Sequence, residues 1–196
     1  NLSLSPVAIP CFATGDNDRF LRFWHEINFN KIGFNIKQRI ETVNSPYKWF
    51  PCNKGGAYRK WYGNREYLLN WGNDGFELCN FRDINGRLRS RPQNLDYCFK
   101  EGITWSTLTN SNLSLRYSPI GTLSETKGSV CYPKATEYNN YVLGFLNSCI
   151  INKIIKIISP TIDYHEGPLS KLPLKVENMS EITNIVTENI KISKDD

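Results

Sequence analysis

The chain is organised around residues 47–105, which read YKWFPCNKGGAYRKWYGNREYLLNWGNDGFELCNFRDINGRLRSRPQNLDYCFKEGITW. Between residues 48 and 100 it holds ten Lys or Arg and five Asp or Glu, a surplus equal to the net charge of +5 of the whole chain. Four of the five tryptophans also lie between Trp49 and Trp105. Cations interleaved with flat rings suit a polyanion that carries stackable bases. The stretch therefore predicts a nucleic-acid contact surface, with its cations and indole rings on one outward face.

Turn residues divide this stretch into short aromatic runs. Gly63-Asn64 separates residues 57–62 from residues 65–71, and a two-residue Gly-Asn connection between such runs predicts a β-hairpin. Asn73-Asp74-Gly75 and Asp83-Ile84-Asn85-Gly86 are two further turn signals.

The run Arg87-Leu88-Arg89-Ser90-Arg91-Pro92 places an arginine at every second position. In an extended strand these three arginines project to one side. Like charges so spaced repel one another unless solvent or phosphate screens them. The run is equally consistent with a phosphate-binding strand and with a solvated edge strand that discourages aggregation.

The runs that follow residue 102 favour β-structure, at residues 103–105, 113–117 and 129–132. Residues 141–158 then predict one long helix, because apolar residues recur at three- and four-residue steps, and Pro160 ends it. A last amphipathic helix is predicted after Ser180, with Ile182, Ile185, Val186 and Ile190 on one face. Strands first and helices last predict an α+β domain, with C-terminal helices packed on a mixed or antiparallel sheet.

The composition excludes several classes of protein. A chain of 196 residues that is 40% hydrophobic and 22% charged can bury a core and is not a disordered tail. Its sequence has no secretory signal and no run of roughly 18 apolar residues, so we expect a cytoplasmic protein with no membrane partner. The six cysteines are too widely spaced for a zinc knuckle, and we expect free thiols.

Catalytic motifs are scarce. Asn44-Ser45-Pro46-Tyr47 approaches the Asn-Pro-Pro-Tyr motif with which amino-methyltransferases hold a flipped base, but it lacks one proline and no glycine-rich cofactor loop precedes it. We interpret it as a turn. Residues 14–20 are likewise interpreted as a turn, because they lack the calcium-loop spacing. Glu125-Thr126-Lys127 has the Glu-x-Lys spacing of metal-dependent nucleases, without an Asp in register to share the metal. We interpret His25 and His165 as structural histidines.

A resemblance to a known family rests on strings spread over nearly the whole chain. They are TGDNDRFLR (14–22), KWFP (48–51), NKGG (53–56), YRKWYGN (58–64), NWGNDG (70–75), RPQN (91–94), FKEGITWS (99–106), RYSP (116–119), LGFLNS (143–148), SPT (159–161) and LP (172–173). In this order they resemble the C-terminal part of the adenine-specific DNA methyltransferases of BREX phage-defence systems, the PglX family. The last three strings are also similar to the target-recognition domains of TaqI-like methyltransferases and of type I restriction specificity subunits.

The resemblance implies that this region reads a DNA sequence, while the catalytic motif and the S-adenosylmethionine site lie in an N-terminal domain. The chain begins at Asn1 and its single methionine is Met179, so we expect a piece of a longer protein. For this piece we expect no catalytic residue, no metal and no cofactor of its own. The expected partners are double-stranded DNA, the N-terminal methyltransferase domain of the parent chain and possible further defence-system proteins.

We therefore predict a DNA-recognition module of an N6-adenine methyltransferase, with residues 1–178 as the recognition domain and residues 179–196 as its C-terminal amphipathic helix or linker. The residues expected to contact DNA are Lys48, Asn53, Lys54, Arg59, Lys60, Arg65, Arg82, Arg87, Arg89, Arg91, Gln93 and Arg116. Two alternatives stay open. One is a small metal-dependent nuclease that uses Glu125 and Lys127, and the other is a module that binds a defence partner or a phage inhibitor.

Overall fold

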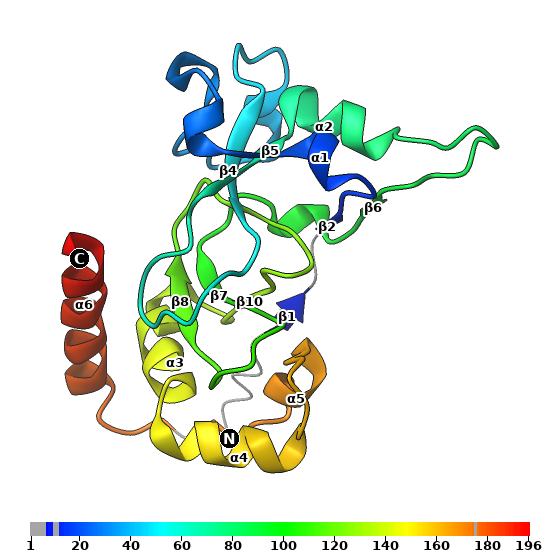
Figure 1. Ribbon diagram of the computed structural model, residues 1–196. Coiled ribbons are helices and arrows are strands. Elements are labelled where there is room, and N and C mark those ends of the chain that lie inside the picture. Colours follow the sequence, from blue (N-terminus) through cyan, green and yellow to red (C-terminus); the bar gives the residue numbers. More distant parts are fainter. Residues whose placement is uncertain (1–6, 10–11, 175) are drawn as a thin grey trace.

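Two four-stranded sheets and a C-terminal group of helices make up the fold (Figure 1). The computed structural model describes residues 7–9, 12–174 and 176–196. Its strands are β1 (Val7–Ile9), β2 (Phe12–Ala13), β3 (Leu21–Phe23), β4 (Trp49–Asn53), β5 (Tyr67–Asn70), β6 (Arg91–Pro92), β7 (Gly102–Trp105), β8 (Leu115–Ser118), β9 (Leu123–Ser124) and β10 (Val130–Tyr132). Its α-helices are α1 (Asn17–Phe20), α2 (Gly72–Cys79), α3 (Asn139–Leu146), α4 (Cys149–Ile158), α5 (Glu166–Ser170) and α6 (Met179–Asp195). Short 3₁₀ helices are η1 (Trp24–Glu26), η2 (Phe29–Lys31), η3 (Arg39–Thr42), η4 (Leu95–Tyr97) and η5 (Thr136–Tyr138).

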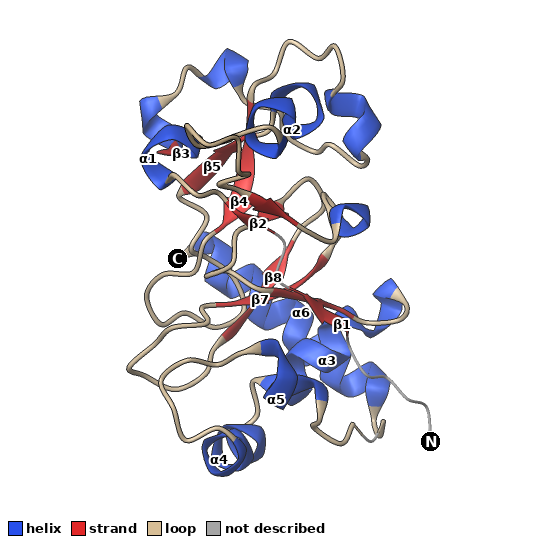
Figure 2. Cartoon of the chain, turned by 90° about the vertical axis from the view of Figure 1, so that its right-hand side faces the viewer, coloured by secondary structure: helices blue, strands red, loops and turns tan. Residues whose placement is uncertain are grey.

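The first sheet has the order β1-β10-β7-β8, and every neighbouring pair in it is antiparallel. Its inner face packs on the helices, because Trp105 and Leu115 share one core with Val142 of α3, Ile155 of α4 and Val186 of α6. The helices cover this sheet, which Figure 2 shows from the side. We call this sheet with its helices the helical half.

The second sheet has the order β3-β5-β4-β9, in which only β4 and β9 run parallel. Its core is aromatic, and Phe50, Trp71 and Phe99 are fully buried beside Leu69 and Leu78. The short pair β2-β6 lies beside it. We call this part of the molecule the aromatic half. An α+β fold with C-terminal helices is therefore confirmed.

The predicted hairpin around Gly63-Asn64 is wrong. Residues 57–62 form no strand, and β5 instead pairs with β4 and β3 on its two sides. Trp61 forms a lone parallel bridge with Arg116 of β8. Its N–H donates to the Leu115 carbonyl at 2.9 Å, so the 57–62 run pairs with a strand far along the chain rather than with its neighbour.

The predicted helix over residues 141–158 is two helices, α3 and α4, bent by 76°. The break has a physical cause. The Asn147 amide turns away to donate to the Leu115 carbonyl at 2.9 Å and to accept from the Leu115 N–H at 3.0 Å. Ser148 then caps α4 by accepting the Ile151 N–H at 3.3 Å, which starts a new helix direction.

Other predictions have mixed outcomes. The last helix is confirmed as α6, which buries Val186 and Ile190. Phe20 is buried, whereas Trp24 is 57% exposed. No single helix within the described ranges is long and apolar enough to cross a membrane, and only the bent pair α3–α4 passes that test of length and composition jointly.

Candidate nucleic-acid interface

A hairpin arm extends from the aromatic half between α2 and β6, away from the rest of the molecule (Figure 1). We define the arm as residues 81–89. The Asp83 N–H donates to the Arg87 carbonyl at 2.9 Å, and the Arg89 N–H donates to the Phe81 carbonyl at 2.8 Å. Asp83 Oδ1 also accepts the N–H groups of Asn85 and Arg87 at 2.8 and 2.9 Å. The turn signal read from the sequence at residues 83–86 is thus a hairpin turn, whose fourth residue Gly86 has a φ of 77°.

The arginines of the arm and of the strand that follows it are exposed: Arg82, Arg87, Arg89 and Arg91. None of the four has an ion-pair partner within the described part of the chain. Between them, Ser90 is buried and donates to the Leu78 carbonyl at 2.5 Å. Two residues separate these three arginines. Ser90 is buried, whereas Leu88 is exposed like Arg87, Arg89 and Arg91.

The base of the arm is held by a group of charges around Phe81. The guanidinium groups of Arg19 and Arg89 each lie 4.9 Å from the centre of the Phe81 ring. Arg19 donates two hydrogen bonds to Glu77, at 3.0 and 2.8 Å, and Lys48 lies 3.4 Å from the other carboxylate oxygen of Glu77. The hydrogen bond from Arg19 lowers the pKa of Glu77, and burial opposes that shift in part.

A second group of cations lies far from the arm, on the connection between β4 and β5. This connection, residues 54–66, runs along the outer edge of β8 on the side of α6 (Figure 1). Lys60 donates to the Asn147 carbonyl at 2.9 Å, and Lys54 lies 4.9 Å from the centre of the Tyr67 ring. Arg65 lies 5.7 Å from the Tyr62 ring centre, and burial lowers its pKa. Arg59 is exposed.

Two of the predicted contact residues are buried. Asn53 is 3% exposed, and its amide donates to Ser118 Oγ at 2.8 Å and to Ser124 Oγ at 3.3 Å. Arg116 is 1% exposed, and its guanidinium donates to the Arg59 carbonyl at 3.4 Å and to Ser106 Oγ at 3.3 Å. Burial lowers the pKa of Arg116 to about 10. Both side chains join segments of the fold.

The single outward face of cations and indole rings is also wrong. Trp71 and Trp105 are fully buried, because each fills the core of its own half. Trp49 and Trp61 are half-buried. The cations divide into the arm side and the β8 side, which lie on opposite sides of Figure 1. On the arm side are Lys48, Arg82, Arg87, Arg89 and Arg91, with the half-buried Gln93 close by in sequence.

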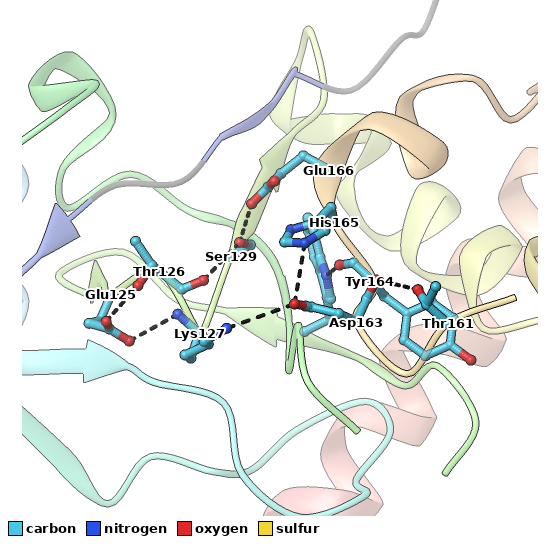
Figure 3. A network of polar contacts seen from close by, with 10 residues as sticks. Glu125, Thr126, Lys127, Ser129, Thr161, Asp163, Tyr164, His165 and Glu166 are labelled. Atoms are coloured by element: carbon cyan, nitrogen blue, oxygen red, sulfur yellow. Dashed lines mark hydrogen bonds and ion pairs between the residues drawn. The ribbon is translucent and has the colours of Figure 1, made fainter. Parts of the chain in front are cut away.

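The candidate nuclease pair does not form a metal centre (Figure 3). Glu125 is buried, and its carboxylate accepts from Thr126 Oγ1 at 2.6 Å and from the Lys127 N–H at 2.9 Å. Lys127 turns toward Asp163, at 3.9 Å, and His165 lies 3.2 Å from the same carboxylate. In the part of the chain that the structure describes, no three His, Cys, Asp or Glu residues are grouped so as to hold a metal ion. These contacts join the loop at residues 125–129 to the loop before α5.

The Asn44-Ser45-Pro46-Tyr47 string is a turn, as predicted, whereas residues 14–20 are irregular only as far as Asp16 and continue as the helix α1. Asp16 caps α1 by accepting the Arg19 N–H at 3.0 Å. In the Asn44-Ser45-Pro46-Tyr47 string, Asn44 has a φ of 57°, and Ser45 Oγ accepts the Tyr47 N–H at 3.1 Å. These side chains serve the local backbone.

Sequence reasoning missed two residues of the arm side. Arg19 lies against Phe81 beside Arg89, although the two arginines are 70 positions apart in the printed sequence. Only the fold reveals that contact. Ile84 is at the tip of the arm and is 100% exposed. Ile84 belongs to the turn signal at residues 83–86, so a hairpin predicted around that turn would have placed Ile84 at its tip.

Comparisons with known proteins place the chain beside adenine-specific methyltransferases. It is 38% identical over 185 residues to the "Adenine-specific methyltransferase PglX" of Lacticaseibacillus casei (strain Zhang), a match that covers 93% of this chain and 15% of that protein. It is 37% identical over 186 residues to the "Adenine-specific methyltransferase BrxX" of Escherichia coli O9:H4 (strain HS), covering 93% of this chain and 14% of that protein. No family model matches the chain. Along nearly its whole length, the chain is therefore homologous to one segment of adenine-specific methyltransferases.

Proposed function

We propose that this chain is the DNA-recognition part of a longer adenine-specific DNA methyltransferase that acts in phage defence in the cytoplasm. The observation that carries the proposal is the exposed arm, whose arginines have no ion-pair partner within the described residues. Its support from comparison is the homology to a segment of such enzymes. Adenine presents its N6 amino group in the major groove of a duplex, so an enzyme that modifies this amino group must position the duplex.

In this proposal the arm side holds the phosphate backbone and sets the register of the protein on the duplex. Lys48, Arg82, Arg87, Arg89 and Arg91 supply the positive charge. Chemistry at the adenine and the binding of S-adenosylmethionine belong to another part of the parent protein. The packing of α6 on α3 supports treating residues 179–196 as the C-terminal helix of the recognition domain, since Gly144 of α3 lets Val186 approach closely.

The proposal predicts weak and strongly salt-dependent binding of the chain to duplex DNA. With about five phosphates engaged, the slope of log affinity against log salt concentration is about −4 to −5. Fluorescence anisotropy of a labelled duplex, titrated at several salt concentrations, measures that slope. Arg91→Ala lowers the affinity, whereas Lys153→Ala, which removes an exposed lysine from α4, leaves it unchanged. An affinity that does not depend on salt contradicts the proposal.

A second surface favours docking to another protein. An apolar hollow of about 380 Å³ lies between α3, α4 and α6, lined in part by Phe145, Ile150 and Ile185. Ile150 and Ile185 are exposed. Exposed apolar patches of this kind mark protein contacts. We propose that the hollow receives the methyltransferase domain of the parent chain.

The docking proposal is tested by mixing this chain with the separately produced remainder of the parent protein. Co-elution that survives nuclease treatment and high salt supports it, because burial of apolar surface is insensitive to screening. Ile150→Asp abolishes the co-elution, whereas Ile157→Asp, an equally drastic change on an exposed residue of α4 outside the hollow, does not. Equal loss in both variants contradicts a site at the hollow.

A further inference from the structure

The tip of the arm presents an isoleucine to solvent. Ile84 is 100% exposed, the highest value among the large apolar side chains of the described residues, and no contact with those residues explains its presence. Leaving such a side chain in water forgoes the stabilisation that burial gives. A solubility device would carry a charge at this position instead.

The backbone of the turn does not require an isoleucine. Asp83 closes the turn through its side-chain oxygen, and Gly86 supplies the positive φ of 77° that other residues rarely adopt. Ile84 occupies the second position of this turn, where most residue types fit. Folding therefore does not require an isoleucine at position 84, and contact with a ligand accounts for its presence.

The two arginines nearest the tip lie on opposite faces of the hairpin. Arg82 is opposite Leu88 in the antiparallel ladder, and Asp83 is opposite Arg87. Because directly opposed residues project to the same face and successive residues alternate, Arg82 and Arg87 point to different faces. Arg82 donates one hydrogen bond to the Gly86 carbonyl at 2.9 Å, which leaves its remaining donors available.

This arrangement fits the major groove of duplex DNA. That groove is about 12 Å wide and about 8.5 Å deep, and it admits a two-stranded β-ribbon. Three residue steps separate Phe81 at the base from Ile84 at the tip, a reach of about 10 Å at the usual rise of a strand. A ribbon of this length that enters tip first has a charged face toward each wall of phosphates and an apolar tip toward the base edges.

We propose that the arm enters the major groove, with Ile84 against the base edges and with Arg82 and Arg87 on the phosphates of the two opposite walls. The inference rests on the proposed DNA-binding function and adds which element reads the bases. An isoleucine favours the C5-methyl group of thymine, the apolar group of that groove, so the arm selects a thymine at the position under its tip.

The test uses the whole chain and a duplex that the unmodified chain has selected from a random-sequence pool. Ile84→Asn weakens binding by about tenfold, the scale of burying one such side chain, and leaves the slope of affinity against salt unchanged. Arg82→Ala and Arg87→Ala each weaken binding and make that slope shallower by about one. Ile162→Asn is the matched control, because Ile162 is also an exposed isoleucine, at 61%, on a loop of the helical half.

Two further measurements fix the groove and the base. Methyl green, which occupies the major groove, competes with the chain, whereas the minor-groove ligand netropsin does not. Replacing thymine by deoxyuracil weakens binding of the unmodified chain but not of the Ile84→Asn variant. Circular dichroism and the melting temperature of each variant match those of the unmodified chain, because the substituted side chains are exposed.

The outcomes separate this inference from the function on which it rests. If the unmodified chain binds with a steep salt dependence, but Ile84→Asn behaves like Ile162→Asn, the placement of the arm is wrong and the DNA-binding function stands. Competition by netropsin alone also overturns the placement. If the unmodified chain binds no duplex even at low salt, both are overturned.

Discussion

Two connections of this chain look alike in sequence and behave differently in the fold. The arm, residues 81–89, and the β4–β5 connection, residues 54–66, both combine glycine, asparagine, arginine and an aromatic ring. The arm pairs with itself and projects from the molecule. The β4–β5 connection pairs with β8 through Trp61, whose N–H and carbonyl bond to Leu115 and Tyr117 at 2.9 and 2.8 Å. One connection is an outward element, and the other fastens the two halves together.

The two connections differ in the hydrogen bonds and the backbone φ angles of their turns. In the arm, the Asp83 carboxylate accepts two backbone N–H groups and Gly86 follows at the position that needs a positive φ. In the other connection, Trp61, Gly63 and Asn64 all have positive φ, at 70°, 127° and 54°. A backbone bent three times within four residues cannot continue a ladder with the strand after it. The Arg116 side chain donates to the Arg59 carbonyl of this connection at 3.4 Å.

We expect the largest effect on stability at Arg116. Arg116→Ala lowers the free energy of unfolding by about 3 kcal/mol, because it leaves a cavity in a packed interior. Arg116→Met, which keeps the volume and removes a buried charge, costs far less or stabilises the chain, since Nε has no partner within the described residues and burial already lowers the pKa to about 10. Urea denaturation of both variants measures the difference. An equal loss of unfolding free energy in the two variants would mean that the guanidinium group of Arg116, and not the volume of its side chain, holds the β4–β5 connection in place.

A smaller effect is expected at Gly86 in the arm. Gly86→Ala destabilises the hairpin by about 1 kcal/mol, because an L-residue at φ 77° is strained even though its Cβ meets no neighbour within 4 Å. Gly86→Asn recovers part of this loss, since asparagine tolerates the left-handed region. Hydrogen exchange of the Asp83 and Arg89 amides reports the opening of the arm. The free energy of global unfolding should hardly change in these variants, and a large change in it would show that the arm is part of the core.

The smallest effect concerns pH at the base of the arm. The folded-state pKa of Glu77 lies below the ordinary value of 4.5. Its contribution to stability is therefore present above that value and is lost as the pH falls through the folded pKa. Glu77 is partly exposed, so solvent screening limits this contribution to less than about 1 kcal/mol. Melting temperatures of the unmodified chain and of Glu77→Gln should differ near neutral pH and converge under acid. A difference in melting temperature that persists at low pH would show that packing, and not the charge of Glu77, causes it.

The sequence predicts those parts of the fold that depend on neighbouring residues. The turn at residues 83–86, the strands β7, β8 and β10 and the amphipathic helix α6 all follow from local patterns. The break between α3 and α4 does not, because it depends on the bonds of Asn147 to Leu115, 32 positions away. The partner of residues 57–62 was missed for the same reason.

The candidate site shows the same limit. Exposed arginines of the arm were among the predicted contacts because a local run of alternating charge marks them. Asn53 and Arg116 carry equally polar side chains, and only the fold reveals that they bond to Ser118, Ser124 and Ser106 inside the protein. Burial of a polar group is decided by distant partners, which composition and spacing do not contain. The contact residues that stay exposed remain predictions for the experiments above.

The bend at Asn147 has a consequence for association between molecules. A carboxamide resembles a peptide group, and that of Asn147 engages both backbone groups of Leu115 as the next strand of a sheet would. Together with Trp61 it occupies the N–H and carbonyl groups of Leu115 and the N–H group of Tyr117 on this edge of β8, which hinders pairing with a strand from another copy. The Asn147 side chain thus shields part of this edge, and Asn147→Leu should make the chain more prone to aggregation.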